Sequence, residues 1–220
     1  GKLYPEEVVL ISAHLDSWDG PGSQGCVDNA TGCAVMLEAA RLLATSGVEP
    51  DRTIRVILWT GEEQGLHGSR AYVESLSEAE LENISAMFVD DGGTNFQGGA
   101  PAADFMVPYL AAASAPVNGR FVSKTDRQTQ LADDNPSNDD RAGQLNVNIR
   151  PTGPEIDTHR GSDHAPLLRA GVPAFYWDEV GRANYRWGWH TQHDTFDLAI
   201  PEYLHQSATN MAVVAYRLAC

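Results

Sequence analysis

Three short apolar runs, each ending in acidic residues or a histidine, constrain the fold of this chain most strongly. We expect strands over residues 8–13, 53–60 and 84–89. Apolar residues at helical spacing lie between and after these runs. We expect helices over residues 30–44, 69–76 and 77–83, the last opening with a Ser77–Glu80 capping box. Alternation of nearly continuous apolar strands with helices predicts an α/β fold with three layers, α/β/α, around a mainly parallel, mixed central sheet.

The second half of the chain has a weaker pattern. We expect a short helix, a strand and a C-terminal helix over residues 162–170, 172–177 and 201–218. Residues 125–138 are rich in Asp, Asn, Gln and Ser, which favours a long surface loop or insertion, and residues 182–193 form an aromatic-rich loop. Because no repeat or convincing linker divides the sequence, residues 1–220 are expected to form a single domain.

Composition excludes several classes of protein. Acidic residues outnumber basic ones 30 to 15, giving a net charge of -15, which argues against nucleic acid as a partner. No apolar run reaches the ~20 residues of a membrane span, and no signal peptide precedes the first strand. The three cysteines lack the spacing of a disulfide framework or a structural zinc site, although a single bridge stays open. No sequence feature sets an oligomeric state.

Residues that can bind metal ions follow the expected strands. The first three strands end in His14, in Glu62 with Glu63, and in Asp90 with Asp91. Because the carboxyl ends of parallel strands meet at one edge of a sheet, these side chains are expected to lie together. Asp28 closes a glycine-rich loop on the same side, and His190 lies in the aromatic loop, from which it could return to that edge.

Such a mixture of imidazole and carboxylate groups suits Zn²⁺. Two ions about 3.5–4 Å apart need one carboxylate that both share, and five ligands with one shared give each ion three. A water or hydroxide held between the ions would be the nucleophile. Adjacent Glu62 and Glu63 project in different directions, so one can bind metal while the other takes a proton from the water.

Four ordered motifs resemble those of the co-catalytic zinc exopeptidases, metallopeptidase family twenty-eight, which contains aminopeptidases and a carboxypeptidase Q branch. The motifs are His-Leu-Asp-Ser-Trp-Asp at 14–19, Val-Asp-Asn-Ala-Thr-Gly at 27–32, Trp-Thr-Gly-Glu-Glu-Gln-Gly at 59–65 and His-Thr-Gln-His-Asp-Thr at 190–195. The resemblance implies the phosphorylase/hydrolase-like zinc peptidase fold, two Zn²⁺ per chain, and a secreted or periplasmic location. Longer relatives carry N-terminal segments, and some a protease-associated domain, without counterpart in this chain.

The resemblance also assigns roles to individual residues. It implies five metal ligands, namely His14, Asp28 as the bridge, Glu63, Asp91 and His190. It further implies Glu62 as general base, Asp16 as an outer acid that orients a ligating imidazole, and a substrate pocket near His159, Asp163 and His164. Asp90 competes with Asp91, because a one-residue slip on a strand exchanges its two faces.

Together these features predict a zinc-dependent exopeptidase that hydrolyses the terminal bond of peptides or dipeptides. Aminopeptidase and dipeptidase activity both fit the predicted site. A single-zinc acyltransferase similar to glutaminyl cyclase is the alternative enzyme, and a non-catalytic receptor-like domain on the same fold is the alternative outside enzymes.

Overall fold

A four-stranded parallel sheet forms the centre of the molecule. The computed structural model describes residues 1–132, 141–155 and 161–220. The strands are β1 (Tyr4–His14), β2 (Arg52–Trp59), β3 (Ile84–Val89) and β6 (Ala174–Tyr176). They are ordered β2-β1-β3-β6, and every pair in this sheet is parallel. The strand predictions for the first half of the chain are therefore confirmed, with β1 beginning earlier than expected.

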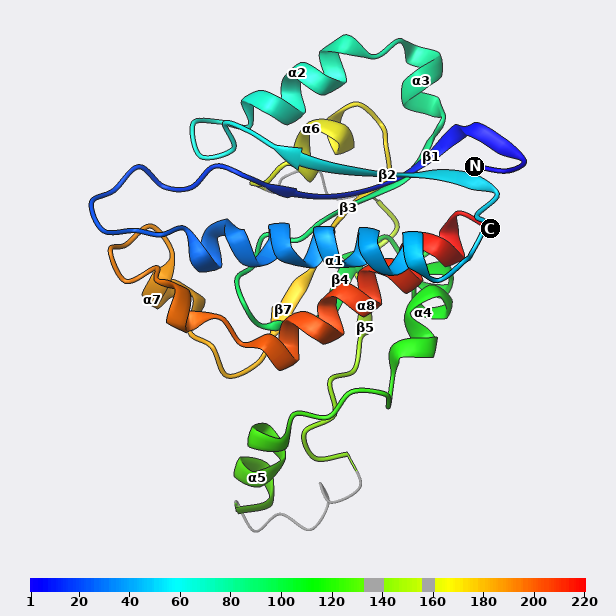
Figure 1. Cartoon of the computed structure of the whole chain (residues 1–220). Coiled ribbons are helices and arrows are strands. Elements are labelled where there is room, and N and C mark those ends of the chain that lie inside the picture. The colour runs from blue at the N-terminus through cyan, green and yellow to red at the C-terminus, as the bar shows by residue number, and fades with distance from the viewer. Residues whose placement is uncertain (133–140, 156–160) are drawn as a thin grey trace.

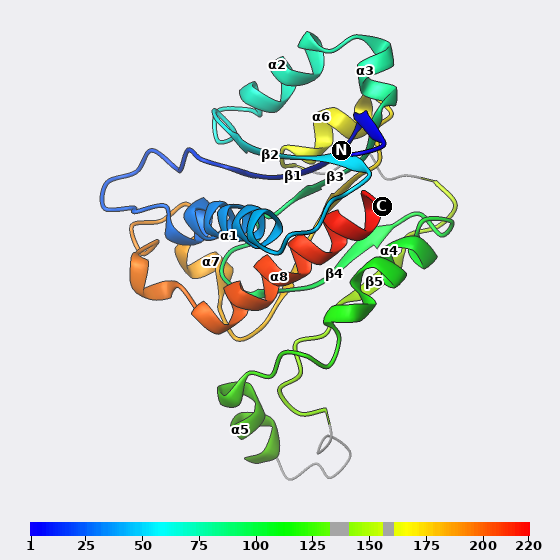
Figure 2. The same ribbon diagram turned by 45° about the vertical axis from the view of Figure 1, so that its right-hand side comes forward.

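Helices cover both faces of this sheet, as the nearly continuous apolar strands predict (Figure 1). The helices of the three-layered part are α1 (Thr31–Thr45), α2 (His67–Ser75), α3 (Glu78–Glu82), α6 (His164–Arg169) and α8 (Pro201–Leu218). Helices α2, α3 and α6 lie on one face, and α1 and α8 lie on the other (Figures 1 and 2). The expected three-layer α/β/α architecture is present.

Alternating side chains of β1 divide the core in two. Val9 and Ile11 belong to the apolar cluster that includes residues of α1 and α8. Leu10 belongs to the cluster on the opposite face, which includes Leu167 of α6. Side chains of a strand point alternately to its two faces, so a strand covered on both faces is apolar throughout. This burial holds the carboxyl end of β1, and with it His14, in a fixed position.

A second sheet, absent from the sequence predictions, adjoins the first. It contains β4 (Phe96–Ala102), β5 (Asn148–Pro151) and β7 (Asp178–Val180) in the order β5-β4-β7, with β4 parallel to β5 and antiparallel to β7. Helix α4 (Val107–Ser114) follows β4. Glycines dilute the apolar pattern of β4, yet Gly99 is required, because a Cβ there would lie 2.1 Å from the carbonyl oxygen of Asn148.

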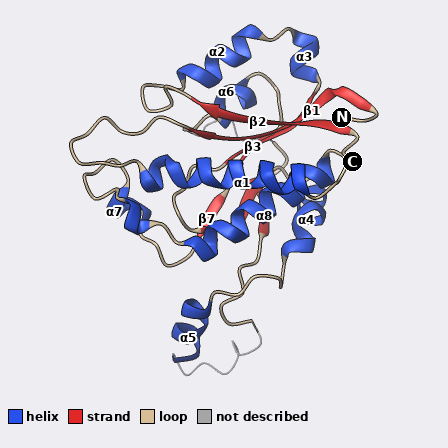
Figure 3. Cartoon of the chain, in the orientation of Figure 1, coloured by secondary structure: helices blue, strands red, loops and turns tan. Residues whose placement is uncertain are grey.

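Two loop predictions are wrong in part. Residues 125–138 were expected to be a loop, but α5 (Lys124–Ala132) is helical, and residues 133–138 lie outside the described residues. This helix is polar and lacks the apolar stripe that would have predicted it. The Ser123 hydroxyl caps it by accepting a hydrogen bond from the backbone N–H of Asp126 (3.1 Å). The helix lies on an arm that extends from the sheet (Figure 3). The expected loop at 182–193 contains the short helix α7 (Tyr185–Gly188).

Shorter elements and the remaining predictions complete the fold. The short elements among the described residues are η1 (Cys26–Ala30), η2 (Ala115–Val117) and η4 (Phe196–Leu198). Element η1 is not a regular helix, because Asp28 and Asn29 have non-helical backbone angles. The Ser77–Glu80 capping box is present, and Pro201 lies in the first turn of α8. Cys26, Cys33 and Cys220 are free thiols, so the possible bridge is absent. Within the described residues, no helix combines the length and apolar character needed to cross a membrane.

Candidate metal centre

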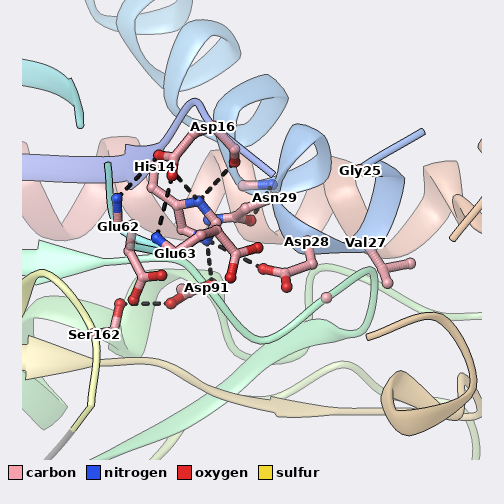
Figure 4. Close-up of polar contacts among 12 residues, drawn as sticks. His14, Asp16, Gly25, Val27, Asp28, Asn29, Glu62, Glu63, Asp91 and Ser162 are labelled. Atoms are coloured by element: carbon pink, nitrogen blue, oxygen red, sulfur yellow. Dashed lines mark hydrogen bonds and ion pairs between the residues drawn. The ribbon is translucent and has the colours of Figure 1, made fainter. Parts of the chain in front are cut away.

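The predicted ligands converge at the carboxyl edge of the parallel sheet. His14 is the last residue of β1, Glu63 lies in the turn after β2, and Asp91 follows β3. Gly61, with a φ of 67°, allows the chain to turn sharply before the two glutamates. Asp28 enters from η1, and the side chains point toward one another in Figure 4.

The first ligand group consists of His14, Asp28 and Asp91, all of them buried. The Nε2 atom of His14 lies 2.9 Å from Oδ1 of Asp91 and 3.1 Å from Oδ1 of Asp28. The second group consists of Asp28, Glu63 and His190. There the Nε2 atom of His190 lies 2.7 Å from Oε2 of Glu63 and 3.3 Å from Oδ2 of Asp28. The two oxygens of Asp28 therefore face different groups.

The structure separates Asp91 from Asp90. Asp91 faces the cluster, and its Oδ2 accepts a 2.5 Å hydrogen bond from the Ser162 hydroxyl. Asp90 is buried elsewhere and accepts a 2.5 Å hydrogen bond from the side-chain amide of Gln97. Asp91, and not Asp90, thus belongs to a ligand group. Neighbouring residues at a strand end point in opposite directions, which explains the division.

Asp16 holds the site differently from the expectation. Its carboxylate accepts hydrogen bonds from the backbone N–H groups of Glu62 (3.2 Å) and Glu63 (3.1 Å). The Nδ1 atom of His14 lies 2.9 Å from the backbone oxygen of Asp16 and 3.8 Å from its carboxylate. The backbone oxygen of Asp16 thus orients the imidazole of His14. The carboxylate of Asp16 fixes the turn that carries Glu62 and Glu63.

The site concentrates negative charge in a poorly solvated space. Burial disfavours the charged form of His14, but hydrogen bonds and charges from Asp28 and Asp91 outweigh it and raise the pKa of His14 to about 12. Burial, followed by the charge of Asp91, raises the pKa of Glu62 to about 8. Burial, followed by the charge of Asp28, raises the pKa of Glu63 to about 7. These carboxylates need a cation to stay ionised together.

The donor set fits zinc. Oδ2 of Asp28 and Oε1 of Glu63 are buried and accept no hydrogen bond from any described residue. Buried carboxylate oxygens without donors are rare unless an ion or water satisfies them. Two imidazoles and three carboxylates, divided into two groups around one shared carboxylate, match the ligands and arrangement of two-metal sites.

A cavity of about 290 Å³ opens beside the ligand groups. Its lining residues are Asp28, Glu62, Glu63, Asp91, Gly161, Tyr176, Tyr185, Trp189 and His190. Glu62 therefore faces the same space as the ligands. The predicted pocket residues Asp163 and His164 are not among the residues that line this cavity. Asp163 accepts a hydrogen bond from Ser69 (2.5 Å), His164 lines a separate small cavity, and His159 falls in an undescribed segment.

Sequence reasoning assigned no role to three aromatic residues of the cavity, Tyr176, Tyr185 and Trp189. Tyr176 ends β6, and its hydroxyl donates a hydrogen bond to the backbone oxygen of Asp91. The strand-end argument that found His14 would also have found this tyrosine. Tyr185 and Trp189 come from α7 and the residue after it, and Trp189 stacks on His190 with ring centroids 4.4 Å apart. Only the fold brings these two residues into the cavity.

Comparison with known proteins agrees with this geometry. The sequence profile described as Peptidase family M28 matches residues 1–215. The chain belongs to this family. It is 33% identical to carboxypeptidase Q of Xenopus laevis over 220 residues, which is 100% of this chain and 40% of that protein. It is 30% identical to aminopeptidase YwaD of Bacillus subtilis (strain 168) over 213 residues, 96% of this chain and 41% of the relative. The chain therefore spans less than half of these relatives.

Solved structures share the fold. A Peptidase M28 precursor from Shewanella amazonensis superposes with a TM-score of 0.75 at 28% identity, covering 100% of this chain and 42% of that one. BSAP, a zinc aminopeptidase from Bacillus subtilis, superposes with a TM-score of 0.64 at 27% identity, covering 96% and 46%. Glutaminyl cyclase of Macrostomum lignano, at 16% identity, 97% and 68% coverage and a TM-score of 0.66, shows the shared fold alone.

Proposed function

We propose that this chain is the catalytic domain of a zinc-dependent exopeptidase that uses two zinc ions to hydrolyse the terminal bond of peptides or dipeptides. The supporting observation is the shared carboxylate of Asp28, whose Oδ1 lies near His14 and whose Oδ2 lies near His190. A two-ion site needs one ligand in common, and Asp28 is common to both ligand groups.

In this proposal the residues divide the chemistry among them. His14, Asp28 and Asp91 would hold one ion, and Asp28, Glu63 and His190 would hold the other. When bound, such a pair of ions polarises a carbonyl and lowers the pKa of water. Glu62 lines the same cavity without belonging to either ligand group, so its carboxylate is free to accept and return a proton. It takes a proton from water and later gives one to the leaving amine.

The lining of the cavity is compatible with both aminopeptidase and dipeptidase activity. Its described residues contribute four carboxylates, those of Asp28, Glu62, Glu63 and Asp91, and neither lysine nor arginine. Two Zn²⁺ would offset the charge of the three carboxylates that belong to the ligand groups, so the charge of the lining by itself selects neither end of a peptide. The named relatives, carboxypeptidase Q and aminopeptidase YwaD, are compatible with either specificity. A secreted or periplasmic location stays a prediction.

The alternatives have less support. A single-zinc glutaminyl cyclase-like enzyme would not need the second ligand group around Glu63 and His190. A receptor-like domain would not need Glu62, whose carboxylate faces the cavity beside the ligands without belonging to either ligand group. Metal analysis of the purified chain, combined with hydrolysis of aminoacyl and dipeptide substrates, separates the three. One tightly bound ion together with cyclisation of glutaminyl peptides would favour the cyclase.

Glu62→Gln tests the assigned base. It should keep the zinc content and lower kcat about 10²- to 10⁴-fold, because the amide cannot take a proton. Glu74→Gln on exposed α2 is the matched control and should leave both quantities unchanged. A fully active Glu62→Gln variant would show that the proton is taken by another group.

A further inference from the structure

Asp194 joins the two loops that carry Asp28 and His190. Its carboxylate accepts hydrogen bonds from two successive backbone N–H groups, those of Val27 (2.7 Å) and Asp28 (3.1 Å). The residue is only 1% exposed, although it lies in the loop four residues after His190. A buried carboxylate that accepts two backbone hydrogen bonds is held firmly and holds its donors in turn.

Further contacts fix the same pair of loops. The backbone N–H of Gln24 donates to the backbone oxygen of Asp194 (2.7 Å), and the side chain of Gln24 accepts from the N–H of Phe196 (2.8 Å). Gly188 at the end of α7 packs so closely on η1 that a Cβ there would lie 2.7 Å from a methyl group of Val27. The loops thus form one packed unit, with the Asp194 carboxylate at its buried centre.

We propose that Asp194 is a positioning residue that sets the placement of the shared ligand Asp28 relative to His190. Asp194 binds the peptide groups directly before the Asp28 side chain, and its own loop supplies the other ligand. Movement of either loop would change the separation between Oδ2 of Asp28 and Nε2 of His190, which is 3.3 Å. Because Asp28 belongs to both ligand groups, both ions depend on this contact. The inference rests on the proposed two-zinc function and goes beyond it by assigning a role to a residue outside the ligand set.

The test compares Asp194→Asn with Asp197→Asn. The first variant keeps the volume of the side chain but places an amide where one backbone N–H needs an acceptor. Asp197 lies three residues further along the chain in η4, is exposed, and accepts a hydrogen bond from Thr195 instead of from η1, so its variant is the matched control. Zinc is titrated into metal-free protein, and the cobalt(II) absorption spectrum is recorded as a signature of ligand geometry.

We expect Asp194→Asn to weaken zinc binding about 10- to 100-fold, as loss of an outer partner of a metal ligand does, and to change the cobalt spectrum. Asp197→Asn should match the wild type in both. If Asp194→Asn lowers only the melting temperature, and the folded protein keeps wild-type zinc affinity and spectrum, Asp194 is merely structural and the inference is overturned.

Two further measurements keep the outcomes separate. If Asp194→Asn does not fold without metal, Asp194→Glu keeps the charge and displaces the carboxylate by one methylene. The zinc affinity of Asp194→Glu should be lower than that of the wild type, but by less than the about 10- to 100-fold expected for Asp194→Asn. Wild-type affinity would again overturn the inference. A wild-type chain that binds fewer than two zinc ions would instead contradict the proposed function.

Discussion

The two ligand groups share Asp28 but are held by different parts of the fold. His14 and Asp91 follow central strands, and their side chains are 1% and 9% exposed. Glu63 lies in a turn, and His190 lies in an aromatic loop with its side chain 36% exposed. The backbone of His190 is left-handed, with a φ of 54°, a conformation that its packed surroundings must impose. One group is thus built by the sheet and the other by loops.

This difference bears on how firmly each group would hold an ion. The His14 group is buried and built on strand ends, so its ligands are held in place before an ion binds. The loop-built group relies on a more exposed histidine, while the Asp194 contact holds Asp28, which both groups share. We therefore expect the group at His14 to bind its ion more tightly and the group at His190 to exchange its ion more readily.

Asp28→Asn should have the largest effect, because it removes the one ligand common to both groups. The amide keeps a single acceptor oxygen, so it cannot bridge. We expect zinc content to fall from two ions to one or none. We also expect kcat/KM to fall by more than about 100-fold, which is the upper end of the cost of losing a group that only hydrogen-bonds to a metal ligand. Metal analysis and steady-state kinetics check this. Retention of two tightly bound ions would mean that the two groups do not share Asp28 as a ligand.

The fold around strand β1 could be predicted from the sequence, because burial on both faces makes the strand apolar throughout. Strand β1 is covered on both faces, so its apolar run marks both the strand and the place where His14 must emerge. In contrast, β4 contains Gly98 and Gly99, and α5 is polar, so neither carries the periodicity that identifies an element. Their structure depends on contacts distant in sequence, which a pattern of neighbours does not contain.

The site divides in the same way. Strand ends and adjacent carboxylates pointed to His14 and to the pair Glu62 and Glu63 without knowledge of the fold, and the family resemblance chose Glu63 as the ligand. The roles of Asp16 and Asp194 could not be found so directly, because each carboxylate binds backbone N–H groups of a distant segment, and any residue there offers the same donor. Sequence reveals which side chains can do chemistry more readily than which ones hold them in place.

Replacing each histidine by alanine compares the groups directly in metal-free protein. His14→Ala leaves two buried carboxylates without their cation and should lower the free energy of unfolding by about 3–5 kcal/mol. His190→Ala removes a partly exposed partner and should cost about 0–1 kcal/mol. Urea unfolding monitored by circular dichroism measures both. Equal losses would show that exposure does not distinguish the two groups.

Stepwise removal of metal should separate the groups further. A chelator is expected to take the ions in two steps whose affinities differ at least about tenfold, or about 1.4 kcal/mol. The weaker step should disappear in His190→Ala, which keeps the His14 group intact. Competition with a zinc indicator measures both steps. A single step involving both ions in the wild type would contradict independent affinities and favour cooperative loss through Asp28.

The last expected effect is a pH dependence of metal-free stability. Burial, followed by the charge of Asp28, raises the pKa of Glu63 from 4.5 to about 7 in the folded protein. The folded state therefore binds this proton more tightly than the unfolded state, so the stabilisation is present below pH 4.5 and lost as pH rises to about 7. For His14, raised from 6.5 to about 12, the loss begins only above pH 6.5.

The two groups consequently occupy different pH windows. Between pH 4.5 and 6.5 the melting temperature of the wild type should fall relative to Glu63→Gln, by about 2–4 °C for each kcal/mol involved. Above pH 8 that difference should stay constant, while the wild type continues to lose stability relative to His14→Ala. Zinc should remove the fall, because ions bind the deprotonated ligands. Identical pH profiles for Glu63→Gln and the wild type would indicate that the loop-built group carries no proton of its own, and that the buried group alone responds to pH.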